Sequence, residues 1–95
     1  GDNIFKTEIK IPTRLLLRLK DIYGNKVNRL NEYFMELGNG GEKITDDLYE
    51  FEVKYLVNEE LVNKTDDILY RRTKLGIEFP SEAKERLSSI LKRYT

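Results

Sequence analysis

The stretch TRLLLRLKDIYGNKVNRLNEYFMEL, residues 13–37, decides the fold, because its apolar residues recur twice at helical spacing. Thr13 is placed to cap a first helix, and Gly24 is placed to end it. A second apolar stripe follows directly and predicts a second helix up to residue 37. The two stripes consist of Leu15, Leu16, Leu19, Ile22 and Tyr23, and then of Val27, Leu30, Phe34 and Leu37.

The residues that follow predict a loop and a third helix. The run Gly-Asn-Gly-Gly at 38–41 cannot continue a helix and predicts a flexible loop. Thr45 is a second candidate N-cap, and the acidic residues 46 and 47 would occupy the first turn of a third helix. The apolar face of this helix would be formed by Leu48, Phe51, Tyr55 and Leu56. The pattern weakens over residues 58–64, which predicts either a break or a kinked continuation of the helix.

Two more helices are expected after the break. Thr65, followed by two aspartates, predicts the start of a fourth helix that runs to about Leu75 and ends at Gly76. A last helix begins at Pro80 and Ser81. Its apolar side would be formed by Ala83, Leu87, Ile90, Leu91 and Tyr94. We therefore predict an all-α fold, a small bundle of about five short helices.

The predicted domain organisation is simple. Ninety-five residues suffice for one small core, so residues 13–95 are expected to form a single helical domain. The chain begins Gly-Asp-Asn, and residues 1–12 are interpreted as a tag remnant and an extended lead-in that reaches Pro12. The longest apolar run, residues 15–17, is far shorter than a membrane span, so we expect the chain itself to be soluble. We expect a cytoplasmic location.

The composition excludes several function classes. The chain contains no cysteine and no histidine, which argues against disulfides, thiol nucleophiles and ordinary zinc sites. Its 17 basic and 17 acidic residues cancel, so a nucleic-acid partner is not expected. The aspartate pairs at 46–47 and 66–67 are explained by helix starts, and their spacing is not that of a calcium loop. We therefore expect no metal.

Two charged residues are projected onto apolar helix faces. A regular α-helix places Arg72 between Ile68 and Leu69, and it places Glu52 between Leu48 and Leu56. Because a charge on a core face must be paired, we predict that Arg72 binds a carboxylate. The available partners are Glu52, Glu59 and Glu60, whereas Arg71 should form a modest exposed ion pair with Asp67. The less favoured alternative is an anion site formed by Arg71, Arg72 and Lys74.

Two segments together carry a family resemblance. Residues 55–60 read YLVNEE and residues 67–76 read DILYRRTKLG. They resemble the C-terminal domain of FAD-dependent glycerol-3-phosphate dehydrogenases and alpha-glycerophosphate oxidases. The family pattern has a tyrosine, a glutamate, and then Asp, two aliphatic residues, one variable position and Arg-Arg-Thr. The matching residues are Glu60, Asp67, Ile68, Leu69, Arg71, Arg72 and Thr73.

The resemblance implies an accessory role. In the family, FAD, substrate and the catalytic residues belong to larger preceding domains, so none is expected here; no G-x-G-x-x-G motif occurs. The parent would oxidise glycerol 3-phosphate to dihydroxyacetone phosphate and associate only peripherally with a membrane. The partners would be the flavin and substrate domains, with a homodimer contact as an option. We assign Glu52, Glu60, Asp67, Arg71, Arg72 and Thr73 to a structural motif. The alternative is a free-standing helical protein-interaction module.

Overall fold

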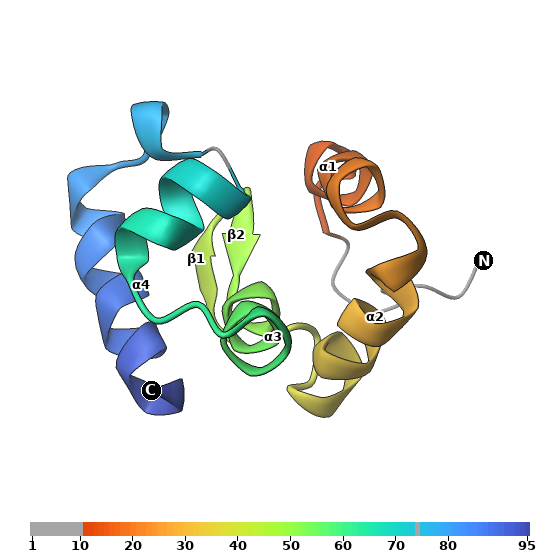
Figure 1. The fold of residues 1–95 in the computed structure, drawn as a ribbon. Helices are drawn as coiled ribbons and strands as arrows, with labels where there is room; N and C mark the ends of the chain where they lie inside the picture. Colours follow the sequence, from red (N-terminus) through yellow and green to blue (C-terminus); the bar gives the residue numbers. More distant parts are fainter. Residues whose placement is uncertain (1–10, 74) are drawn as a thin grey trace. The chain divides into compact units, whose positions relative to one another are not determined.

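The computed structural model describes residues 11–73 and 75–95 (Figure 1). The predicted tag remnant and most of the lead-in, residues 1–10, lie outside the described residues, as does Lys74. The chain divides into two compact units, Gly1–Glu52 and Val53–Thr95, here called the N-terminal and C-terminal units. The boundary between them falls inside one helix.

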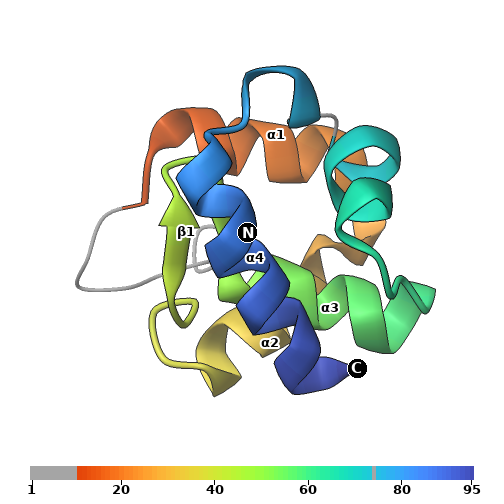
Figure 2. The same cartoon turned by 90° about the vertical axis from the view of Figure 1, so that its left-hand side faces the viewer.

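The N-terminal unit begins with the two predicted helices. These are helix α1 (Thr13–Tyr23) and helix α2 (Val27–Glu36), both labelled in Figure 2. Helix α1 buries Leu15, Leu19 and Tyr23, and helix α2 buries Leu30, Tyr33 and Phe34. A 3-10 turn, Gly24–Lys26, connects the two helices, and Gly24 has a φ of 53°. The predicted stripes are largely confirmed, although Ile22 is 41% exposed.

The prediction that Thr13 caps the first helix was wrong. Pro12 is the N-cap residue, and its carbonyl oxygen accepts a hydrogen bond of 3.2 Å from the Leu16 N–H. Pro12 has a φ of −59° and a ψ of 138°, which is the extended backbone of a cap residue. Thr13 is therefore the first residue of the helix.

Residues 43–49 form a β-hairpin where the sequence predicted a helix start. Strands β1 (Lys43–Thr45) and β2 (Leu48–Tyr49) are antiparallel, and Lys43 pairs with Tyr49. The Thr45 Oγ1 accepts a 3.1 Å hydrogen bond from the Asp47 N–H. This local bond resembles an N-cap bond but closes a turn, so the same residue types are compatible with both structures. Helix α3 begins after the hairpin and spans Glu50–Glu60.

The C-terminal unit contains the rest of α3, a short helical turn and the last helix. The predicted break after α3 is confirmed, because Leu61 has a φ of 58°. The fourth helix is present but wound as a π-helix over Asp67–Arg72. Helix α4 (Ser81–Tyr94) follows a 3-10 turn, Gly76–Glu78, and its buried residues, Ala83, Leu87, Ile90 and Leu91, are those predicted.

Both ends of the fourth helix differ from the prediction. Thr65 is not its cap, because the Lys64 carbonyl already accepts a hydrogen bond of 3.3 Å from the Ile68 N–H. The helix ends at Arg72 rather than near Leu75. The Thr73 N–H and hydroxyl both donate to the Ile68 carbonyl, at 2.9 and 2.8 Å, and these bonds close the π-helical turn.

The fold class is confirmed as mostly α-helical. The described residues form four α-helices and one two-stranded sheet. The hairpin replaces the start of the predicted third helix, and the predicted fourth helix is reduced to a short π-helical segment. None of the helices in the described ranges has the length and apolarity needed to cross a membrane.

Candidate functional site

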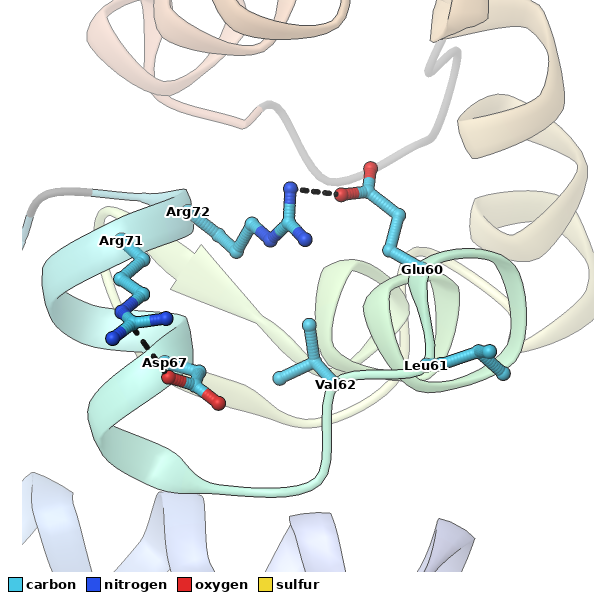
Figure 3. Close-up of a pocket in the computed structure, with 6 residues that line it drawn as sticks. All are labelled: Glu60, Leu61, Val62, Asp67, Arg71 and Arg72. Carbon is cyan, nitrogen blue, oxygen red and sulfur yellow. Dashed lines mark ion pairs between the residues drawn. The ribbon is translucent and has the colours of Figure 1, made fainter.

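Most of the motif residues line one hollow in the C-terminal unit, called here the motif pocket (Figure 3). Its volume is about 290 Å³. The pocket is formed by the end of α3, the residues directly after it, and the π-helical turn. Its lining residues are Glu60, Leu61, Val62, Asp67, Arg71 and Arg72.

The end of α3 shapes one side of the pocket. Glu60 is the last residue of the helix, and Leu61 adopts the left-handed backbone that usually follows a helix C-terminus. The Val62 N–H then donates a 3.1 Å hydrogen bond back to the Leu56 carbonyl. This reversal buries Val62 and leaves the Leu61 side chain 84% exposed.

An ion pair joins the two elements that form the pocket. Arg72 Nη1 lies 2.8 Å from Glu60 Oε1, so Glu60 is the partner among the three carboxylates considered for Arg72. The Arg72 side chain is 47% exposed, however, and the predicted position on a core face is wrong. A π-helix winds more residues into each turn than an α-helix, so the α-helical projection misplaced this arginine.

The second arginine forms an ion pair within the π-helical turn itself. Arg71 Nε is 3.6 Å from Asp67 Oδ1, and the Arg71 side chain is 81% exposed. This is the exposed pair that the spacing of four residues predicted. Thr73 does not line the pocket; it is buried, and its hydroxyl accepts a 3.3 Å hydrogen bond from the Leu75 N–H.

Glu52 belongs to the N-terminal unit and forms a separate buried cluster. Its side chain is fully buried, and Arg18 holds it through two bonds, Nη1 to Oε2 at 3.0 Å and Nη2 to Oε1 at 2.7 Å. The Tyr23 hydroxyl donates a third bond of 2.6 Å to Oε2. The expectation that this buried carboxylate needs a partner is met, but the partner is Arg18 rather than Arg72.

The role of Arg18 was not predicted, although its position on the first helix indicates a partly buried side chain. Arg18 lies three residues after Leu15 and next to Leu19, which places it beside the buried stripe of α1. Its Nη2 also donates a 2.6 Å bond to the Asp47 carbonyl. Burial of the guanidinium opposes its charge, but the hydrogen bond and the charge of Glu52 outweigh burial and raise the pKa of Arg18.

The charges of the motif pocket are balanced. Arg71 and Arg72 each face a carboxylate, and Lys74, the third member of the alternative anion site, lies outside the described residues. In the part of the chain that the structure describes, no group of three or more acidic, histidine or cysteine residues is arranged to hold a metal ion. The pocket is therefore a surface of paired charges beside two aliphatic side chains.

Comparison with known proteins shows which family the sequence of this chain matches. Residues 3–94 match the family model described as the C-terminal domain of alpha-glycerophosphate oxidase. The aerobic glycerol-3-phosphate dehydrogenase of Escherichia coli K12 is 44% identical over 55 residues, which cover 58% of this chain and 11% of that protein.

Two Pseudomonas proteins are similar over more of the chain. The glycerol-3-phosphate dehydrogenase of Pseudomonas tolaasii is 37% identical over 71 residues, which cover 75% of this chain and 14% of that protein. The corresponding protein of Pseudomonas aeruginosa is 36% identical over 77 residues, which cover 81% of this chain and 15% of that protein. The chain thus spans between 11% and 15% of the length of these relatives.

Proposed function

Because this chain belongs to the family of C-terminal domains of alpha-glycerophosphate oxidase, we propose that it is the accessory domain of a longer FAD-dependent glycerol-3-phosphate dehydrogenase. The parent oxidises glycerol 3-phosphate to dihydroxyacetone phosphate, and this domain supplies a packing surface. One observation carries the proposal: the family match covers residues 3–94, while the chain spans at most 15% of the relatives' length.

The glycine run of this chain is not placed as a dinucleotide-binding loop. A dinucleotide-binding loop follows a strand and opens a helix, so that its glycines bring the backbone close to the pyrophosphate. The glycine run at 38–41 instead follows α2 and precedes β1. On this proposal the flavin and the substrate are bound by other parts of the parent, and no step of the oxidation is assigned to the residues of this domain.

Exposed apolar side chains support a packing role. In the N-terminal unit, Leu17 is 62% exposed and Met35 is 59% exposed. In the C-terminal unit, Leu61 is 84% exposed and Tyr70 is 49% exposed. Single exposed apolar residues are common on proteins, but a domain that packs on the rest of its parent needs such residues at its contact surface.

The proposal is tested by removing the domain from the parent. We expect the truncated parent to lose bound flavin and glycerol-3-phosphate oxidation, and we expect both to return when the purified 95-residue chain is added. The measurements are the flavin absorbance of the purified enzyme and its oxidation rate.

An unrelated helical protein at the same concentration is the control, since it reproduces any nonspecific stabilisation. If the truncated enzyme equals the intact one in flavin content and rate, the accessory role is wrong. In that case the chain is better described as a free-standing helical interaction module.

A further inference from the structure

Leu61 is unusual both in its backbone and in its exposure. Its φ of 58° lies in the left-handed region, which glycine adopts readily and a leucine adopts at a cost. After α1, the same kind of position is occupied by Gly24, with a φ of 53°. Leu61 therefore accepts an unfavourable backbone, and in this structure its side chain gains no burial in return, since it is 84% exposed.

Arg71 offers an exposed charge at the same pocket. Its Nε is 3.6 Å from Asp67, whereas a charge-assisted bond between nitrogen and oxygen is usually about 2.7–2.9 Å long. Arg72 is held more closely, at 2.8 Å from Glu60. With its side chain 81% exposed, Arg71 can bind a further carboxylate without leaving a buried charge unpaired.

The shape of the pocket brings these two features together. Figure 3 shows Val62 across the hollow from Asp67 and Arg71, with Leu61 at the edge behind Val62 and its side chain directed away from Arg71. An occupant that fits both sides carries an aliphatic side chain close to a carboxylate. A free inorganic anion could contact Arg71 but would leave Leu61 and Val62 without an apolar contact.

We propose that the motif pocket is the docking surface of this domain, and that it receives a segment of the parent chain with an aliphatic residue beside an aspartate or glutamate. This inference rests on the proposed function and specifies its contact. We choose the parent chain as the occupant, rather than a second copy of this domain, because more than four fifths of each relative's length lies outside the matched region. Leu61 would make the apolar contact with this segment, and Arg71 would provide the charge complementary to its carboxylate.

The test uses the full-length parent with either Leu61→Gly or Arg71→Glu. The glycine relieves the backbone strain at residue 61. If Leu61 makes no contact with the rest of the parent, protease should therefore release the domain no faster than before. Docking through Leu61 predicts the opposite: protease should release the domain faster, by about tenfold, while the isolated chain keeps or raises its Tm. Arg71→Glu should act in the same direction.

Lys84→Glu is the matched control, because Lys84 is exposed on α4 and undergoes the same change of sign. We expect it to leave the release rate unchanged. Unchanged release by both pocket variants, with flavin still lost on deletion of the domain, would overturn the docking surface but leave the accessory function intact. If deletion of the domain has no effect either, the proposed function is wrong as well.

The occupant is identified by placing a photo-crosslinking amino acid at position 61 of the full-length parent. A crosslink within the same chain, to an aliphatic residue next to a carboxylate, is the expected result. A crosslink to a second copy, or none at all, would overturn the choice of occupant.

Discussion

Glu52 shows how much one buried side chain depends on its partners. Its carboxylate is fully buried and accepts bonds from Arg18 and from the Tyr23 hydroxyl. Removing two charges from water is costly, and the bidentate pair together with the third bond offsets that cost. The cluster links α1 to the start of α3 within the N-terminal unit.

At the residue scale we therefore predict that Glu52→Gln destabilises the chain by about 3 kcal/mol, because it leaves the Arg18 charge buried without a counter-charge. Chemical denaturation followed by circular dichroism measures the change. Adding Arg18→Met should recover part of the loss, since no unpaired charge then remains buried.

Glu32→Gln is the control for this experiment. Glu32 and Arg29 form a 2.9 Å ion pair in which the side chains are 63% and 51% exposed, so its loss should cost less than about 1 kcal/mol. Equal effects of the two variants would contradict the importance of the buried cluster.

At the scale of elements, hydrogen bonds tie the loop between α2 and the hairpin to both α2 and α3. The Gly40 N–H donates to the Phe34 carbonyl at 3.2 Å, and its own carbonyl accepts from the Phe51 N–H at 3.0 Å. The rings of Phe34 and Phe51 pack edge to face with centroids 5.1 Å apart. Gly40 is therefore buried, with the rings of Phe34 of α2 and Phe51 of α3 beside it.

Two glycines of this loop form a matched pair of tests. Gly38 and Gly40 both have a positive φ, 67° and 88°, so alanine strains the backbone at either position. A Cβ at Gly38 meets open space, whereas one at Gly40 would lie 2.9 Å from Phe51 Cδ1. We predict a loss of about 1 kcal/mol for Gly38→Ala and a further loss of about 1–3 kcal/mol for Gly40→Ala.

Thermal and urea unfolding of the two variants checks this prediction. Similar losses would mean that the ring contacts rearrange easily and that the backbone alone sets the cost.

At the scale of the whole molecule, the absence of histidine and cysteine determines the response to pH. No side chain of the chain has an ordinary pKa near neutrality. The hydrogen bond and charge of Lys43 lower the pKa of Asp46, and the same two interactions raise the pKa of Lys43. The contribution of Asp46 is thus lost only as the pH falls through its lowered pKa, and that of Lys43 only as the pH rises through its raised pKa.

We therefore predict that the Tm of the chain stays nearly constant between about pH 6 and pH 9 and falls below about pH 4, where carboxylates are protonated. Calorimetry at a series of pH values measures it. A clear transition near pH 7 would show that this fold shifts the pKa of some group into the neutral range.

Local patterns in the sequence determined the helices of residues 13–36 and the last helix, because apolar periodicity and a glycine after a helix act within a few residues. They also marked Glu52 as a charge that needs a partner.

The tertiary structure decided that Arg18, 34 residues away, is that partner, because the backbone determines which guanidinium reaches a carboxylate. It decided between helix and hairpin at residues 43–49, where threonine and aspartate suit a cap and a turn equally. The π-helical winding of residues 67–72 likewise turned Arg72 away from the core and toward Glu60, a rotation that α-helical spacing could not reveal.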